Sequence, residues 1–156
     1  MSIFKYFKMK TIHMYVYHRD TPHVVDLPEP EHPYNIEHTK PNQTTYRIEK
    51  DGCTIHESTV YKRLHFLGII DKQGPTIGNC FTHNDYRGHG IYPAMLNLIT
   101  NKLLVEEHVA EVFVIVDVHN IPSIKGIEKA GFTLYATIKT KRFLFFYLNQ
   151  EVHYGA

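Results

Sequence analysis

The sequence lacks most of the features that mark specialised classes of protein. Its two cysteines, Cys53 and Cys80, do not form a CxxC motif, which excludes a disulfide framework and indicates a reducing compartment. Seventeen basic and sixteen acidic residues give a net charge of +1, without the basic excess of a nucleic-acid-binding protein. No apolar run approaches the ~20 residues of a membrane span, and lysines interrupt the N-terminal apolar residues too often for a signal peptide. We therefore expect a cytoplasmic protein with no nucleic-acid partner and no membrane span.

Metal-ligand motifs are also missing, although the chain contains twelve histidines. The histidines are scattered, with no HxH or HExxH motif and no histidine pair beside a cysteine cluster. Spacing rather than number identifies a metal site, so we expect no bound metal.

The length and composition are those of an ordinary globular domain. The chain has 156 residues, of which 43% are hydrophobic and 21% are charged. We expect one domain over residues 1–156, with a variable N-terminal part at 1–43 and a core at 44–148.

The first half of the chain predicts mainly strands. Thr11–His18 is rich in β-branched and aromatic residues and predicts a strand. Residues 19–43 contain most of the eight prolines, which predicts an irregular segment with at most short helical turns. A hairpin is predicted over residues 44–61, turning at Asp51-Gly52. After an apolar run at 63–70, the stretch "PTIGNCFTH" predicts another strand.

The second half predicts alternating helices and strands. Apolar residues recur at helical spacing between Ala94 and Leu104, with Asn97, Asn101 and Lys102 expected to point away. The run "EVFVIVDV" is typical of a strand that is covered on both faces. A helix is predicted from an N-cap at Asn120 to Gly131, followed by two closing strands over 132–149. This order indicates an α/β or α+β sheet with helices packed on its faces.

The corner before the first of these helices has the composition of an anion-binding loop. Gly88 and Gly90 lack side chains that would keep an anion away from the free N–H groups at the helix start. Arg87 adds a permanent cation whose forked donors suit phosphate oxygens. The loop is neither a Walker loop nor a dinucleotide fingerprint. The sequence therefore predicts a phosphate or pyrophosphate site at this corner, and a solvated turn is the alternative.

Two short motifs are similar to those of a known superfamily. "THNDYRGHGIY" resembles the acyl-CoA loop of the GNAT N-acyltransferases, R/Q-x-x-G-x-G/A, with Arg87 and Gly90 in place and Tyr92 departing from the usual glycine or alanine. "NIPSIKGIEKAGF" resembles a second helix motif of that superfamily, with Asn120 and Ser123 in place. The resemblance covers about Gln43 to Leu148 in the order of strands and helices. It implies a mixed, mainly antiparallel sheet with helices on both faces and a splayed pair of strands that forms the coenzyme cleft.

The resemblance also implies that acetyl-CoA is the acyl donor. Backbone groups near Phe81 and Thr82 would pair with the pantetheine arm, and an N–H near Thr82 could polarise the thioester carbonyl. The pyrophosphate would be held by Arg87 and by the amides of Gly88, His89, Gly90, Ile91 and Tyr92. Asn120 and Ser123 would contact the pantetheine arm or cap their helix.

The catalytic acid and base are less well defined. Many members of the superfamily have a tyrosine acid at the position of Ile127, and this chain lacks it. "PTIGNCFT" carries no carboxylate, which leaves His83 as the best-placed candidate base, with Glu57 as the second and His65, Asp117 and His119 as further candidates. Cys80 could form an acyl-enzyme or could be a small buried residue.

The expected function is the direct transfer of an acetyl group from acetyl-CoA to a primary amine of a small molecule, such as an amino sugar. One alternative is a catalytically silent CoA-binding or regulatory module of the same fold, and another is a phosphate-binding or protein-interaction domain. The aromatic C-terminal segment also allows a homodimer.

Overall fold

The computed structural model describes residues 8–155, which build one eight-stranded sheet. Its strands are β1 (Lys10–Arg19), β2 (Tyr34–Lys40), β3 (Gln43–Lys50), β4 (Cys53–Tyr61), β5 (Thr76–Thr82), β6 (Val112–Asp117), β7 (Thr133–Phe143) and β8 (Phe146–Tyr154). They lie in the order β2-β3-β4-β5-β6-β1-β7-β8. The α-helices are α1 (Ile91–Val105) and α2 (Ile121–Lys129), and the short 3₁₀ helices are η2 (His65–Ile70) and η3 (Asn84–Tyr86).

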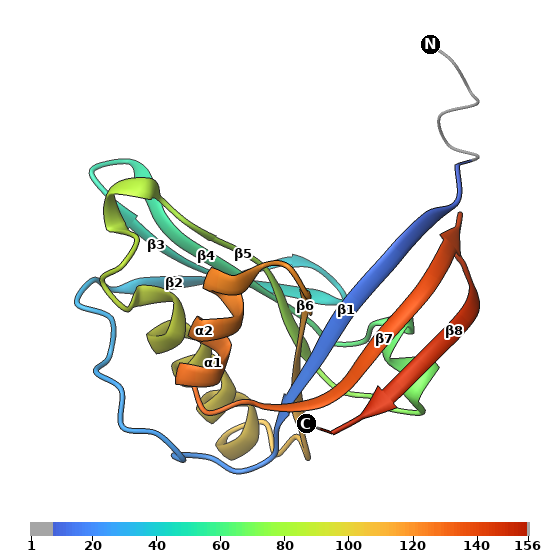
Figure 1. Ribbon diagram of the computed structural model, residues 1–156. Coiled ribbons are helices and arrows are strands. Elements are labelled where there is room, and N and C mark those ends of the chain that lie inside the picture. The colour runs from blue at the N-terminus through green and yellow to red at the C-terminus, as the bar shows by residue number, and fades with distance from the viewer. Residues whose placement is uncertain (1–7, 156) are drawn as a thin grey trace.

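The sheet is antiparallel except at its centre. β5 and β6 are parallel neighbours, and a parallel pair needs a crossover, which here is α1. α2 follows β6 and leads across β1 to β7. Figure 1 shows both α-helices side by side on one face of the sheet. The predicted class, a mixed and mainly antiparallel sheet, is confirmed.

Each face of the sheet has its own hydrophobic core. Successive strand residues point to opposite faces, so Tyr17 packs with α1 and α2, while its neighbour Val16 packs in a second cluster. In β6, Val114 and Phe113 divide between the two clusters in the same way. Phe66, Leu67 and Ile70 of η2 cover the second cluster. Helices therefore lie on both faces, as predicted, although η2 is only one short 3₁₀ segment.

The predicted hairpin is present as β3 and β4. Its turn residues Asp51 and Gly52 have φ angles of 52° and 78°. Positive φ at both central positions is what a primed two-residue turn requires.

The prediction of an irregular segment over residues 19–43 is wrong for its second half. Tyr34–Lys40 forms the edge strand β2, which pairs with β3. Pro33 and Pro41 flank this strand and none lies within it, so every residue of the strand keeps its N–H group. The proline count was taken over the whole segment, and it overlooked residues 34–40, a proline-free run that is long enough for a strand. The last strand also continues beyond the predicted end, to Tyr154.

Asn97 does not point away from the core, which corrects a second prediction. Its side chain is buried and accepts a hydrogen bond of 2.8 Å from Nη1 of Arg19. Arg19 is itself only 3% exposed, and its guanidinium also donates to Asn101 and to the backbone carbonyl of Ala130, at the end of α2. One arginine of β1 thus ties both helices to the sheet. The prediction missed this contact because a pattern of apolar residues assigns every polar residue, asparagine included, to the solvent-facing side of the helix.

The turn between β7 and β8 leaves apolar side chains exposed. Phe145 is 90% exposed and Phe146 is 65% exposed. The expected homodimer contact at the C-terminal strands stays a prediction. Within residues 8–155, neither α-helix has the length and apolarity that crossing a membrane requires.

Candidate functional site

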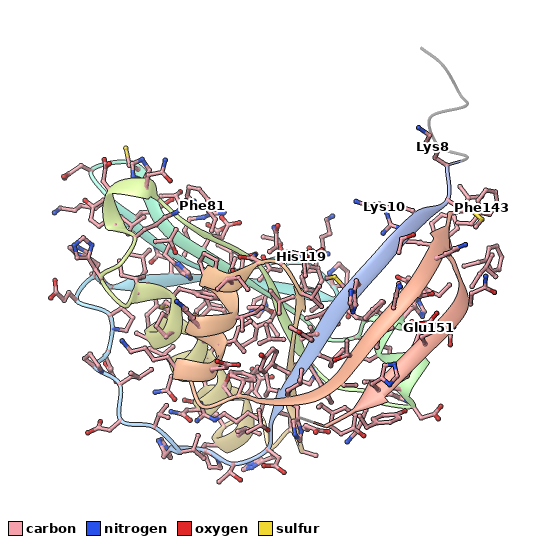
Figure 2. The ribbon with its side chains drawn as sticks, viewed as in Figure 1. Lys8, Lys10, Phe81, His119, Phe143 and Glu151 are labelled. Atoms are coloured by element: carbon pink, nitrogen blue, oxygen red, sulfur yellow. The ribbon has the colours of Figure 1, made fainter. Side chains whose placement is uncertain are left out.

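β5 and β6 separate soon after they meet. They pair only at Thr76 with Phe113 and at Ile77 with Val114, yet β5 continues to Thr82 and β6 to Asp117. Figure 2 labels Phe81 on β5 and His119 just beyond β6, and the two lie well apart. Asn79 has a φ of 49°, and the pairing of β5 with β4 shifts register nearby, so an irregular stretch of β5 accompanies the separation. The splayed strand pair that the resemblance implied is therefore present.

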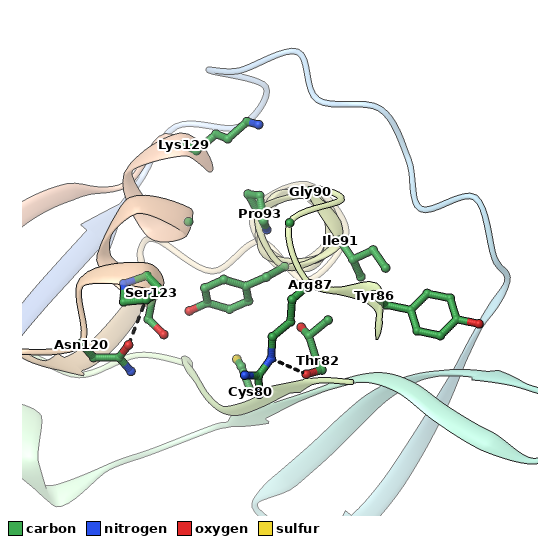
Figure 3. A pocket seen from close by; sticks show the side chains of 14 residues that line it. Cys80, Thr82, Tyr86, Arg87, Gly90, Ile91, Pro93, Asn120, Ser123 and Lys129 are labelled. Carbon is green, nitrogen blue, oxygen red and sulfur yellow. Dashed lines mark hydrogen bonds between the residues drawn. The ribbon is translucent and has the colours of Figure 1, made fainter. Parts of the chain in front are cut away.

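A pocket of about 580 Å³ lies beside this separation. Its walls come from β5, the loop before α1, the first turn of α1, and α2, as Figure 3 shows. The lining residues are Cys80, Thr82, Tyr86, Arg87, Gly88, Gly90, Ile91, Tyr92, Pro93, Asn120, Pro122, Ser123, Gly126 and Lys129. The volume is in the range of small-molecule and cofactor sites.

The N-terminus of α1 opens into this pocket. Gly90 is the N-cap of α1, with a φ of 77° in the left-handed region, and Gly88 has a φ of 79°. A Cβ at either glycine would meet no atom within 4 Å, so the space beside the loop is open. The first N–H groups of a helix have no partner within it and carry a partial positive charge. The loop therefore presents open backbone amides to the pocket, and anion binding there stays a prediction.

Arg87 and Lys129 give the pocket its charge. Nε of Arg87 donates to the backbone carbonyl of Thr82 at 2.9 Å, and this bond, drawn in Figure 3, holds the guanidinium beside the loop. Lys129 contributes a second cation from the end of α2. The pocket-lining residues of the described chain include no carboxylate. The pocket is thus suited to an anion.

The start of α2 forms the opposite wall. Oδ1 of Asn120 accepts a hydrogen bond of 3.3 Å from the Ser123 N–H, so Asn120 caps the helix as predicted. Both side chains also line the pocket. Capping and contact with a ligand are therefore compatible roles for this pair.

Tyr92, the departure from the superfamily motif, packs across the pocket on α2. A Cβ at Gly126 would lie 2.5 Å from Cδ1 of the Tyr92 ring, so only glycine at position 126 leaves room for it. The phenol contacts the thiol of Cys80, and burial raises the pKa of the phenol well above its usual value. The bulk that Tyr92 adds to one wall is thus accommodated by a glycine in the other.

His56 lies behind the β5 wall and is completely buried. Its Nδ1 is 2.8 Å from Oγ1 of Thr82, and its Nε2 is 2.8 Å from Oγ of Ser58. Burial lowers the pKa of His56 to about 4. The imidazole is therefore neutral at physiological pH and has both ring nitrogens hydrogen-bonded.

Acid should destabilise the fold through His56. The unfolded histidine binds a proton near pH 6.5 and the folded one only near pH 4, so stability is lost as the pH falls from 6.5 to 4. The shift corresponds to about 3 kcal/mol of unfolding free energy. Urea titrations across this range would measure it, with His56→Asn as the control. Parallel pH curves for the two proteins would contradict the expectation.

The structure brings most of the predicted coenzyme residues together. Those that line the pocket are Thr82, Arg87, Gly88, Gly90, Ile91, Tyr92, Asn120 and Ser123. Phe81 and His89 do not line it. The Phe81 side chain is 46% exposed, on the opposite face of β5 from its neighbours Cys80 and Thr82.

Neither predicted catalytic side chain lines the pocket. Nδ1 of His83 accepts from the Asp85 N–H at 3.3 Å and caps η3. Glu57 accepts a hydrogen bond of 2.9 Å from Nε of Arg47, which also pairs with Glu37. Both side chains thus have local structural partners, and their catalytic roles stay predictions.

The further candidate bases also lie outside the lining residues. His65 is exposed at the start of η2. Oδ1 of Asp117 accepts from the His119 N–H at 2.9 Å in the turn after β6. Within residues 8–155, no group of three or more metal-ligating side chains is placed to hold a metal ion.

The residues that sequence reasoning missed are His56 and Ser58, behind the wall that β5 forms, and Tyr86, Gly126 and Lys129, in the pocket lining. His56 and Ser58 share one face of β4, and Cys80 and Thr82 share one face of β5. Their i, i+2 spacing indicates that each pair shares a face. The sequence carried no signal for the pairing between the two strands, because that depends on a register shift within β4 and β5.

Comparisons with known proteins bear on the fold. No protein-family model and no curated protein matches the chain. Among solved structures, it is similar to one from Novosphingobium aromaticivorans that is described as an acetyltransferase of the GNAT family, with a TM-score of 0.62 and 12% identity over 85% of this chain. It is also similar to a GNAT-family acetyltransferase from Colwellia psychrerythraea, with a TM-score of 0.52 and 13% identity over 81% of this chain.

The two neighbours are longer proteins, since the match covers 64% of the first and 54% of the second. At this level of identity the likeness is one of fold. Together with the separated β5 and β6 and the open N-terminus of α1, it shows that the chain has the fold of the GNAT acetyltransferases.

Proposed function

We propose that the protein is an acyl-CoA-dependent acyltransferase that transfers an acetyl group to a primary amine of a small molecule. The observation that carries the proposal is the pocket where β5 and β6 separate, which receives the open N-terminus of α1, two glycines at positive φ and Arg87. The names of the two structural neighbours support the same chemistry. An amino sugar is the acceptor that we propose to test first.

In this proposal the chain's own residues bind and orient the donor. The amides of Ile91 and Tyr92 would face the diphosphate of CoA, with Arg87 and Lys129 neutralising its charge. The arm would lie along β5, past Thr82 and Cys80, in the gap that β6 leaves. Holding the thioester in one place favours direct attack by a bound amine.

A catalytically silent CoA-binding module is the second candidate, and one observation favours it. The pocket-lining residues of the described chain include neither an imidazole nor a carboxylate to take the proton of the amine. The titratable side chains among the lining residues are those of Cys80, Tyr86, Arg87, Tyr92 and Lys129. Burial raises the pKa of the Cys80 thiol to about 11, so it is protonated at neutral pH.

Two measurements test these candidates in turn. Thermal shifts with CoA, ATP and NAD identify the ligand, since a ligand at 100 times its Kd adds about 2.7 kcal/mol of stability. Release of free thiol from acetyl-CoA, over a panel of amines that includes amino sugars, then detects transfer. Stabilisation by CoA without thiol release would favour the silent module, and no stabilisation by CoA would refute both.

Replacing Arg87 by alanine should weaken CoA binding by about 1.5–3 kcal/mol, because a hydrogen bond to a charged group is lost. Arg87→Lys should retain part of the affinity, since the charge remains but the forked donors are lost. Isothermal titration with CoA measures both variants. An Arg87→Ala affinity within twofold of the unmodified protein would show that the guanidinium contacts no phosphate.

A further inference from the structure

A chain of buried and partly buried polar side chains connects two walls of the pocket. It runs from Thr82 through His56 and Ser58 to Cys80 and Tyr92, and we call it the His56 chain. Its links are Thr82 Oγ1 to His56 Nδ1 and His56 Nε2 to Ser58 Oγ, both at 2.8 Å, and Ser58 Oγ to Cys80 Sγ at 3.3 Å. The thiol of Cys80 contacts the Tyr92 phenol. Both ends of the chain line the pocket, while His56 is 0% exposed.

The direction of these hydrogen bonds follows from counting protons. The Ser58 hydroxyl has one hydrogen, which it donates to Cys80 Sγ. Its oxygen must then accept from His56 Nε2, so that nitrogen carries the proton of the neutral imidazole. Nδ1 is consequently bare and accepts the hydroxyl hydrogen of Thr82. The Cys80 thiol directs its own hydrogen to the Gly78 carbonyl, with Sγ 3.6 Å from the oxygen, so its sulfur remains the acceptor at this end and fixes the direction of the links up to Thr82.

The consequence lies at the surface of the pocket. With its hydrogen held by His56, the Thr82 hydroxyl can offer only oxygen lone pairs to a ligand. Its carbonyl is fixed as well, because it accepts from Nε of Arg87 at 2.9 Å. Both the hydroxyl and the carbonyl of Thr82 therefore have fixed hydrogen-bond partners, and the residue lies next to Arg87, the cation that would bind phosphate.

We propose that His56 is a positioning residue that makes Thr82 an obligate hydrogen-bond acceptor, so that this wall of the pocket selects a ligand group that donates a hydrogen bond. The inference rests on the proposed function, in which such a group has two sources. One is the pantetheine arm, with its amide N–H and hydroxyl groups, and the other is the acceptor amine. The phosphates and the thioester offer no donor.

Thr82→Val tests the acceptor, because valine has nearly the same shape and no oxygen. The probes are CoA and adenosine 3′,5′-bisphosphate, which carries nucleotide phosphates but no pantetheine arm. If the partner is the arm, Thr82→Val should bind CoA about tenfold more weakly and the bisphosphate unchanged. Thr82→Ser, which restores the hydroxyl, should bind CoA as the unmodified protein does. If the partner is the amine, CoA binding stays constant and the KM of the best amine in the panel rises about tenfold.

His56 is tested by two replacements that each mimic one ring nitrogen. The side-chain oxygen of His56→Asn can take the place of Nδ1 and accept from Thr82, whereas the amide of His56→Gln reaches toward Ser58 and releases the Thr82 hydroxyl. His56→Gln should therefore weaken binding of the affected ligand several-fold, whereas His56→Asn should leave it unchanged. In a Thr82→Val background, His56→Gln should cause no further loss of binding. If His56 were merely structural, His56→Gln would cause the same loss of binding in the unmodified protein and in the Thr82→Val background.

The outcomes separate this inference from the proposed function. Unmodified protein that fails to bind CoA removes the proposed function and the inference with it. Unmodified protein that binds CoA, together with a Thr82→Val variant whose CoA affinity and amine KM are both unchanged, overturns the inference alone. Because Thr82 faces the pocket, this variant decides the question even if the buried His56 variants do not fold.

Discussion

Gly90→Asp is expected to abolish CoA binding while the fold persists. The added carboxylate would stand at the N-cap of α1, in open space beside the free amides, where the diphosphate is proposed to bind. It would repel the ligand, since two like charges within ~4 Å interact by several kcal/mol near a protein surface. A loss of more than a hundredfold in affinity, measured by isothermal titration, is the expected result.

Gly90→Asn is the matched control. Asparagine and aspartate have the same shape, and both tolerate the left-handed conformation that Gly90 adopts with a φ of 77°. The two variants should therefore have similar melting temperatures, and only the charged one should lose CoA. Equal CoA affinities for the two variants would mean that no anion binds at the start of α1.

Arg19→Met should cost about 3–5 kcal/mol of unfolding free energy, the largest effect on stability that we expect. The guanidinium is buried, and it donates to Asn97 Oδ1 and to the Ala130 carbonyl, each at 2.8 Å. Methionine fills much of the same volume but donates nothing, so the Ala130 carbonyl loses its donor and Asn97 Oδ1 keeps only the 3.4 Å bond from the Asn101 amide. Each buried acceptor that loses a charged donor costs about 1–3 kcal/mol.

Urea denaturation of Arg19→Met and of Arg142→Met would measure this effect. Arg142 is exposed on β7, so its replacement should change stability by no more than about 0.5 kcal/mol. A loss below 1 kcal/mol at Arg19 would show that water can replace the arginine at the helix ends.

Local features of the structure were predictable because neighbouring residues determine them. Asp51-Gly52 specifies the hairpin turn, Asn120 specifies the start of α2, and Gly131, with a φ of 81°, specifies its end. Each of these signals depends on the conformation of one or two residues. Composition over a longer window was less informative, since the proline-rich segment contains the strand Tyr34–Lys40.

The residues of the candidate site also divide into those that the local sequence indicated and those that only the fold brought together. The residues of one continuous loop, from Arg87 to Tyr92, could be recognised together because the chain itself holds them near one another. The partners of His56 and the clearance of Tyr92 over Gly126 could not be recognised, because they join elements that are distant in the chain. Side-chain type and place in the chain also favoured His83 and Glu57, whose hydrogen-bond partners only the fold revealed.

The sequence by itself determined that this chain alternates strands and helices and presents bare amides beside an arginine at one corner. Those properties depend on backbone freedom at glycine and on the periodicity of apolar residues, which act over a few positions. Only the tertiary structure decided which side chains line the pocket where β5 and β6 part, that Arg19 joins two helices to the sheet, and that a neutral histidine lies behind Thr82. These depend on strand register and on burial, which arise only when distant segments meet.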